Sequence, residues 1–138
     1  MSLLGAFDVS GSALSAQSVR LNVTASNLAN AETVSSNRET TYRARHPLFA
    51  TTFDMFKDDP EAAAGVKVKG IVESDAELRM RYEPTHPLAN EEGYIFLPNV
   101  NPIEEMANMI SASRSYEYNV EAMNTTKQLM LATLRLGQ

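Results

Sequence analysis

Apolar positions in the first thirty residues recur at alternating spacings of three and four. The larger residues of this stripe are leucine or phenylalanine, and small residues stand between them. An a/d rhythm held over three heptads predicts a long helix that packs against other helices. The small residues would let a neighbouring helix approach closely. The stripe consists of Leu4, Phe7, Gly11, Leu14, Ser18, Leu21, Ala25 and Leu28.

The last forty residues carry a second stripe with the same spacing, in which methionine is frequent. Asn101 followed by Pro102 is typical of the start of a helix, and Gly137 is typical of its end. Ile103, Ile110 and Leu131 widen the stripe. We therefore predict a second long helix with one apolar side. Its stripe consists of Met106, Met109, Ser113, Tyr116, Val120, Met123, Lys127, Met130 and Leu134.

The middle of the chain contains short apolar or alternating runs, which are typical of strands. Gly70 interrupts one of these alternations and favours a β-bulge there. Ser74-Asp75-Ala76 could join the two flanking runs as a hairpin. The composition of residues 58–65 favours an exposed loop. We expect a small sheet. The runs are Tyr42–Arg45, Leu48–Phe53, Val66–Glu73, Glu77–Tyr82 and Tyr94–Leu97.

These patterns predict an α+β fold with two long terminal helices paired as a coiled coil and a small β-rich middle module. The predicted boundaries are 1–36 for the N-terminal helical arm, 37–98 for the β-rich module and 99–138 for the C-terminal helical arm. A chain of 138 residues is long enough for one domain of this kind.

Charge is concentrated in the middle of the chain, although the net charge is −5. A solvated helix face normally carries Lys, Glu and Arg. Depletion of charge marks the centre of an interface. We therefore expect the first helix to be covered on most sides, by more helices than this chain possesses. An ordinary intramolecular helix pair is the alternative. The uncharged face consists of Ser10, Ser12, Ser15, Gln17, Asn22, Thr24, Ser26 and Asn27.

Composition excludes several classes of function. The chain has no cysteine, which excludes disulfide bonds, a thiolate nucleophile and metal sites built from cysteine. Its acidic balance argues against nucleic acid as a partner, because that affinity comes from clustered Lys and Arg. No apolar run approaches the roughly 20 residues that membrane insertion needs. The N-terminus lacks the basic start and long apolar run of a signal peptide.

Candidate catalytic chemistry is sparse. His46-Pro47-Leu48 and His86-Pro87-Leu88 repeat one tripeptide, and their histidines could join nearby acids in a metal site. A histidine in an extended X-Pro segment of a loop is the more common interpretation of such a tripeptide. Glu104-Glu105 fits the first turn of a helix, where carboxylates stabilise the macrodipole. We predict no catalytic residue, no metal site and no cofactor. The nearby acids are Glu83, Glu91 and Glu92.

Two groups of residues resemble a known family. Asn27, Ala29, Asn30 and Thr33 lie in a segment that resembles the Asn-x-Ala-Asn-x-x-Thr signature of bacterial flagellar rod and hook proteins. Val34 to Thr41 then stand where these axial proteins usually have Pro-Gly-Tyr. Further segments resemble the proximal-rod members of that family. They are Tyr82–Ala89, Gly93–Tyr94, Pro98–Asn101, Glu105–Met106, Ser111–Tyr116 and Leu134–Gln138.

The resemblance implies a structural, non-enzymatic subunit of the periplasm-spanning rod in the flagellar basal body. In that family the terminal helices form a coiled-coil domain inside a helical tube, which carries motor torque and forms part of the export channel. The two stripes would then be the assembly interface. Implied partners are copies of the chain, other rod subunits, the rod-base adaptor protein and the flagellar type III export apparatus, through which the chain passes without a cleaved signal peptide.

Two other classes remain open on the sequence alone. A free-standing coiled-coil adaptor would share the stripes but would form a small closed oligomer with ordered arms. A hydrolase or metal enzyme would depend on a residue such as His86.

Overall fold

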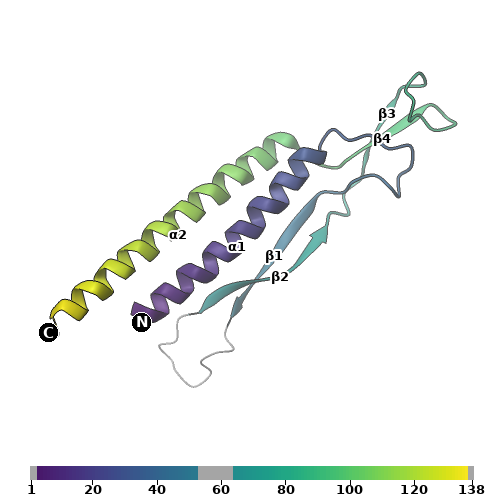
Figure 1. Ribbon diagram of the computed structural model, residues 1–138. Helices are drawn as coiled ribbons and strands as arrows, with labels where there is room; N and C mark the ends of the chain where they lie inside the picture. Colours follow the sequence, from purple (N-terminus) through teal and green to yellow (C-terminus); the bar gives the residue numbers. More distant parts are fainter. Residues whose placement is uncertain (1–2, 53–63, 137–138) are drawn as a thin grey trace.

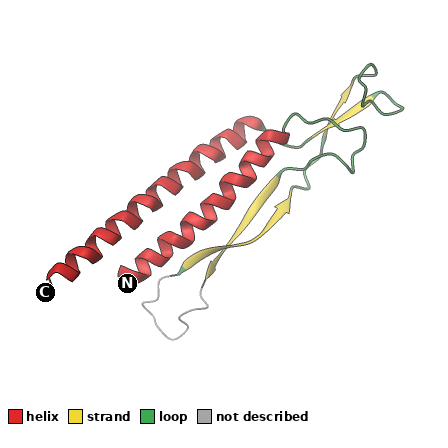
Figure 2. Ribbon diagram, viewed as in Figure 1, coloured by secondary structure: helices red, strands yellow, loops and turns green. Residues whose placement is uncertain are grey.

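Two long helices run antiparallel along most of the molecule, and two small sheets lie beside and beyond them (Figures 1 and 2). The computed structural model describes residues 3–52 and 64–136. The first helix packs against the second helix and also against the first sheet. The elements are α1 Leu3–Asn30, β1 Arg45–Thr52, β2 Gly65–Glu73, β3 Arg79–Tyr82, β4 Tyr94–Leu97 and α2 Pro102–Leu136.

The start of α2 is the one that the sequence predicts. The backbone N–H of Ile103 donates to Asn101 Oδ1 at 3.2 Å, so Asn101 caps the helix and Pro102 is its first residue. Two glutamates occupy the first turn, where the helix dipole favours negative charge. The predicted end at Gly137 lies outside the described residues.

The helix pair is close-packed at a small residue. A Cβ atom on Gly11 would lie 3.5 Å from Met123 Cε, which is ordinary contact, so the two predicted stripes meet at this point. Nearer the other end, Arg20 Nη2 donates to Asn108 Oδ1 at 3.4 Å. The predicted α+β fold with two terminal helices is confirmed, whereas knobs-into-holes packing remains a prediction.

Strands β1 and β2 form an antiparallel hairpin that lies along α1. Leu48 pairs with Gly70 but Phe49 pairs with Val68, so Lys69 is the extra residue of a bulge. The bulge predicted at Gly70 is therefore confirmed.

The hairpin is seated on α1 through a serine. The backbone N–H of Val66 donates to Ser12 Oγ at 3.1 Å. A Cβ atom on Gly65 would lie only 3.0 Å from that same oxygen, so the glycine permits this close approach.

The predicted strand pairing is wrong. Instead of one hairpin across Ser74-Asp75-Ala76, β2 pairs with β1 and β3 pairs with β4, which gives two separate two-stranded sheets. The reason is that the segment between β2 and β3 is hydrogen-bonded to other parts of the chain and does not form a turn between these strands. Ser74 N–H donates to the carbonyl of Ala44 at 2.7 Å, and the side chain of Asn99 donates to the carbonyls of Ser74 and Ala76.

Two of the predicted strand boundaries also shift. Residues 42–44 precede β1. They contact the ends of the helices and do not pair with another strand. Leu78 and Glu77 precede β3. Phe53 and residues 58–63 of the predicted loop lie outside the described residues.

The uncharged face of α1 is partly covered by this chain itself. Ser10, Thr24 and Asn27 are buried, whereas Ser15, Asn22 and Ser26 are exposed. The buried part of this face therefore needs no helix from outside the chain, whereas cover of the exposed part by further helices stays a prediction. Its small side chains let the hairpin backbone approach, as the bond from Val66 to Ser12 shows.

We predict that Gly93→Ala loosens the β3–β4 hairpin. Gly93 has φ +81°, and an added Cβ would lie 2.9 Å from Tyr82 Cε2 and 3.1 Å from Pro84 Cβ. The strained backbone and the clash should lower local stability by about 1–3 kcal/mol. Hydrogen exchange at the amide of Glu83, which donates to the carbonyl of Gly93 at 2.9 Å, measures this.

The matched control is Gly70→Ala, because a Cβ at that position would have no heavy atom of the described residues within 4 Å apart from its chain neighbours. Its effect should stay within about 0.5 kcal/mol. Unchanged protection of the Glu83 amide in the Gly93 variant would contradict the account of this turn.

Candidate assembly site

The side-chain amide of Asn27, in the last turn of α1, joins three parts of the chain. Asn27 is fully buried, with 0% exposure. Its Oδ1 accepts from the hydroxyl of Tyr42 and from the backbone N–H of Arg45, both at 2.9 Å. Its Nδ2 donates to the carbonyl of Arg45 at 2.8 Å and to Glu105 Oε2 at 2.9 Å. All four hydrogen-bonding positions of the amide are used, and they link α1 to β1 and α2.

Glu105 is the group that depends most on this amide. It lies in the first turn of α2 and is only 5% exposed. A buried carboxylate is costly unless it accepts hydrogen bonds. Asn27 Nδ2 supplies one such bond, and the N-terminus of α2 favours the negative charge. The bond between Asn27 and Glu105, together with the bond from Arg20 to Asn108, therefore joins the two helices near this end.

Tyr42 closes the network from the loop before β1. Burial raises the pKa of its phenol, and the carboxylates of Glu105 and Glu73 act in the same direction against the Arg45 guanidinium. The hydroxyl therefore stays protonated and donates to Asn27. The guanidinium of Arg45 lies 5.4 Å from the centroid of the tyrosine ring.

Asn99 forms a second junction next to the first. Its Oδ1 accepts from the N–H of Ala44 at 2.8 Å, and its Nδ2 donates to the carbonyls of Ser74 at 3.2 Å and Ala76 at 2.9 Å. Arg79 Nε donates to the carbonyl of Pro98 at 3.1 Å. The segments before β1, after β2 and before α2 are thus held together by side-chain amide and guanidinium groups.

Between these polar junctions lies a small apolar core. Ala31, Ala44 and Val100 are buried together, and Tyr42 packs against them. Small side chains allow three chain segments to meet here, and the apolar area that they bury is modest.

The four signature residues play different parts. Asn27 is the buried junction residue. Asn30 Nδ2 donates to the carbonyl of Ser26 at 2.8 Å, and Thr33 Oγ1 donates to the carbonyl of Asn30 at 2.8 Å, so both hold the end of α1. Ala29 is exposed. The sequence pattern identified the family but did not reveal that Asn27 is the central group.

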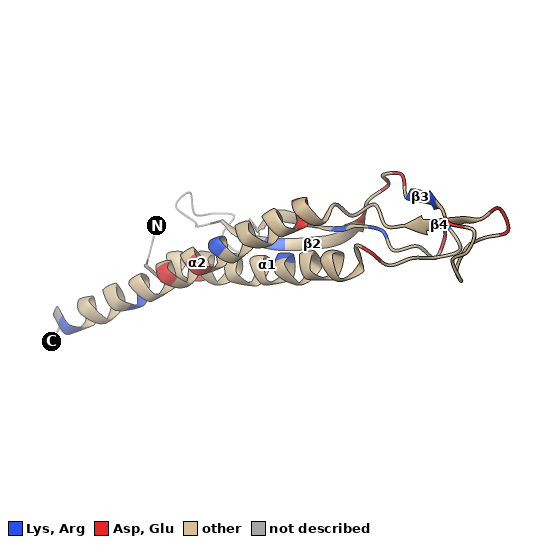
Figure 3. Cartoon of the chain, turned by 90° about the horizontal axis from the view of Figure 1, so that it is seen from above, with Lys and Arg blue, Asp and Glu red and all other residues tan. Residues whose placement is uncertain are grey.

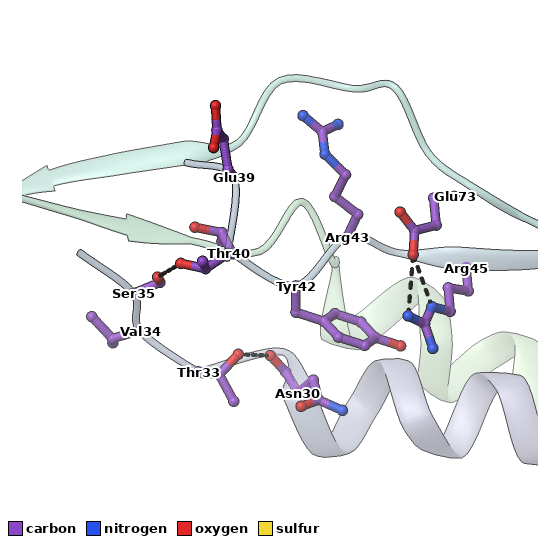
Figure 4. A pocket seen from close by; sticks show the side chains of 11 residues that line it. Asn30, Thr33, Val34, Ser35, Glu39, Thr40, Tyr42, Arg43, Arg45 and Glu73 are labelled. Atoms are coloured by element: carbon purple, nitrogen blue, oxygen red, sulfur yellow. Dashed lines mark hydrogen bonds and ion pairs between the residues drawn. The ribbon is translucent and has the colours of Figure 1, made fainter. Parts of the chain in front are cut away.

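A concave surface of about 600 Å³ opens beside the end of α1 (Figure 4). Tyr42 lies in it, between the Asn30–Thr33 contact and the pair of Arg45 with Glu73. That ion pair is 3.1 Å long and both side chains are about half exposed, so it contributes little stability. The surface presents polar groups engaged with one another and no arrangement of nucleophile and base.

The predicted stripe of α1 is divided between half-buried and exposed residues. Phe7, Gly11, Leu14, Leu21 and Leu28 are half-buried, whereas Leu4, Ser18 and Ala25 are exposed.

The stripe of α2 is divided in the same way. Its half-buried members are Met109, Ser113, Met123 and Met130. Met106, Tyr116, Val120, Lys127 and Leu134 are exposed. The buried residues of α2 are Glu105, Ala112 and Thr126, which shows that the face toward α1 is turned by about one residue from the predicted stripe.

Much of α2 consequently presents apolar side chains to the solvent. Among the helices and strands of the described chain, α2 packs against α1 alone. Further exposed apolar residues lie outside its stripe, and they are Ile103, Ile110, Tyr118, Leu129 and Leu131.

The candidate metal ligands are separated by the fold. His46 lies in β1, and His86 lies in the loop between β3 and β4, on a different sheet. Residues 3–52 and 64–136 contain no group of three or more His, Asp or Glu side chains that could hold a metal ion. Neither of the described helices is long and apolar enough to cross a membrane.

A pair of long terminal helices joined to a small β region, with no group of catalytic or metal-binding side chains among the described residues, is typical of a structural subunit. Comparison with known proteins gives the family. Residues 7–35, mostly in α1, match the family model described as flagella basal body rod protein. Residues 91–136, mostly in α2, match the family model of the C-terminal region of the flagellar basal body rod FlgEFG proteins.

Full-length relatives give the particular family. The chain is 49% identical to the flagellar basal-body rod protein FlgC of Salmonella typhimurium and 50% identical to that of Escherichia coli O157:H7, with both chains of each pair fully covered. It is 38% identical, again over both whole chains, to FlgC of Bacillus subtilis. The chain therefore belongs to the FlgC family of flagellar basal-body rod proteins, and it is a structural subunit of the rod.

We predict that Asn27→Ala destabilises the folded chain by about 1–3 kcal/mol, because it leaves the buried Glu105 carboxylate without its donor. Urea unfolding of the purified chain, followed by circular dichroism, measures the change. Asn22→Ala is the control, since Asn22 is exposed on the same helix. Equal effects of the two substitutions would contradict the role of Asn27.

The isosteric variant Asn27→Asp tests the same contact without changing volume. It replaces the donor Nδ2 with a second carboxylate oxygen facing Glu105 Oε2 and should also be strongly destabilising. Adding Glu105→Gln restores a donor toward residue 27 but leaves a carboxylate oxygen facing the carbonyl of Arg45, so the double variant should recover only part of the loss. Additive destabilisation would show that the two side chains are not coupled.

We expect stability to fall at high pH through Tyr42. The pKa of its phenol is raised in the folded chain, so the folded state holds the proton more tightly. The stability that the protonated phenol contributes is complete below its ordinary pKa of about 10. This stability is lost as the pH rises through the raised pKa of the folded chain. Urea unfolding between pH 9 and 11 should show a steeper decline for the natural chain than for Tyr42→Phe. Identical slopes would contradict this linkage.

Proposed function

We propose that this chain assembles through its terminal helices into the helical tube of the proximal rod, where it transmits motor torque and forms part of the export channel. The terminal segments 1–36 and 99–138 would form the inner helical wall, and residues 37–98 would lie outside it. Its partners would be copies of itself, other rod subunits and the rod-base adaptor protein. The flagellar type III apparatus would export it without a cleaved signal peptide.

The uncovered face of α2 carries this proposal. Ile103 is 79% exposed and Met106 is 55% exposed, and similar residues follow along the helix. Contiguous exposed apolar surface is uncommon on proteins that remain monomeric and marks interaction sites. Packing against the helices of neighbouring subunits would remove this surface from water along the whole helix.

Torque transmission needs a firm connection between the helices and the β region. The bonds of Asn27 to β1 and to α2, together with those of Asn99 to the segment after β2, provide that connection. A load applied to one part would be shared by several short hydrogen bonds, and each bond would be strained only slightly.

Export in an unfolded state suits the small core of this chain. The buried cluster of Ala31, Ala44 and Val100 contributes little apolar burial. A chain with so modest a core would gain much of its order from its neighbours in the rod. The absence of cysteine also avoids cross-linking in an oxidising periplasm.

The alternative function is a free-standing coiled-coil adaptor. The same exposed face of α2 would then close against a second chain in a small oligomer. Analytical ultracentrifugation of the purified chain separates the two, because an adaptor gives one closed species and a rod subunit gives a monomer or open polymers.

We predict that Met106→Asp prevents incorporation into the rod while the isolated chain keeps its fold. Met106 is already exposed in the single chain, so the substitution removes little packing there. In the assembled rod the same carboxylate would be buried without a partner, at about 3–5 kcal/mol. Quantifying the chain in purified basal bodies, with circular dichroism of the free variant, measures both effects.

The matched control is Met106→Leu, which keeps the apolar surface and should be incorporated normally. Motile cells with a full complement of the aspartate variant in their rods would show that this face of α2 is not an assembly interface.

A further inference from the structure

Within the described chain, the segment that contains β3 and β4 and the C-terminal end of α2 carry opposite net charge. We define the tip as residues 75–97, which contain β3, β4 and their loop, and the tail as residues 122–136, the end of α2. The tip holds five carboxylates and two arginines, whereas the tail holds Lys127 and Arg135 and no carboxylate. Figure 3 shows the acidic loops of the tip and the basic residues of the tail at opposite ends.

One face of the tip is apolar and uncovered. Met80 pairs with Phe96 and Tyr82 with Tyr94, so these four side chains share a face. The rings of Tyr82 and Tyr94 meet edge to face with centroids 5.2 Å apart. Met80 is 66% exposed and Tyr82 is 62% exposed, and no helix or strand outside the β3–β4 sheet packs on it in the described chain.

Three acidic side chains belong to the tip beside this face, and one of them has an ion-pair partner. Glu83 is paired with Arg81 at 2.8 Å. Glu91 and Glu92 are exposed, and within the described residues neither side chain forms an ion pair. The loop that carries them is ordered by Asn90, whose Oδ1 accepts from two backbone N–H groups at 3.1 and 2.8 Å.

The tail has the complementary character. Leu129, Leu131 and Leu134 are all between 47% and 68% exposed. Lys127 and Arg135 lie on the same side of α2 as Leu131 and Leu134, whereas Leu129 lies on the opposite side. Neither basic side chain forms an ion pair in the part of the chain that the structure describes. This end of α2 extends beyond the start of α1 (Figure 1).

We propose that the tip docks on the tail of a neighbouring axial subunit, meaning a helix end with exposed leucines flanked by Lys or Arg, as in this chain. The inference rests on the proposed rod function, because assembly in the rod would place such helix ends next to the tip of another subunit. Tyr82 and Met80 would supply the apolar anchor, and the carboxylates of Glu91 and Glu92 would face the basic side chains.

This pairing has a directional consequence. It joins unlike ends of successive subunits, and a contact of that kind propagates instead of closing into a dimer. The apolar anchor would supply most of the affinity, and the charges would fix which end meets which.

Photo-crosslinking in intact basal bodies tests the contact. Tyr82 is replaced by the photoreactive amino acid p-benzoylphenylalanine, and adducts are located by mass spectrometry. The expected adducts lie in the C-terminal end of the long helix of an axial subunit. Adducts confined to other regions, or no adduct from incorporated chain, would overturn the proposal.

Replacement of Arg81 by the same amino acid is the matched control, because neighbouring strand positions point to opposite faces of the sheet. Its yield of tail adducts should be at least tenfold lower. Adding Glu91→Lys and Glu92→Lys to the Tyr82 probe should lower the tail adducts about tenfold as well. Equal yields from the two probes, or no effect of the lysines, would contradict the assigned face and charges.

The amount of chain in the basal bodies separates this proposal from the rod function. Incorporated chain with adducts elsewhere overturns the docking of the tip alone. Failure of the unsubstituted chain to enter the rod would overturn the proposed function, and the tip contact with it.

Discussion

The structure depends on one buried amide. Asn27 offers two donors and two acceptors, and all four have partners at 2.8 or 2.9 Å, which belong to Tyr42, Arg45 and Glu105. An apolar residue of the same size would leave the Glu105 carboxylate and the backbone of Arg45 unsatisfied in a buried site. With so small an apolar core around Ala31, this polar network decides how the two helices and the hairpin are joined.

Local features could be predicted from the sequence because their causes are local. The Asn101–Pro102 start of α2 and the bulge next to Gly70 follow from side chains within a few residues. The choice of strand partners could not be predicted in this way. It is set by Asn99, which lies 25 residues after Ser74 and holds that segment away from a turn. The role of Asn27 was hidden for the same reason, since three of its four bonds reach residues at least 18 positions away.

The helix stripes show what a repeat can and cannot indicate. The spacing predicted two apolar helices, and Gly11 does meet Met123. Yet Met106 and Leu134 are exposed, because α2 presents a slightly rotated face to α1. A sequence repeat does not distinguish a face that packs within the chain from one that packs between chains. The uncharged face of α1 illustrates the same limit, since the hairpin of this chain covers part of it.

The claim that the terminal helices complete their packing only within the rod is tested most directly by electron cryo-microscopy of intact basal bodies at side-chain detail. The account predicts that Met106, Tyr116 and Leu134, all exposed in the single chain, contact helices of adjacent subunits. Density that leaves these side chains facing solvent, with the chain incorporated, would contradict it.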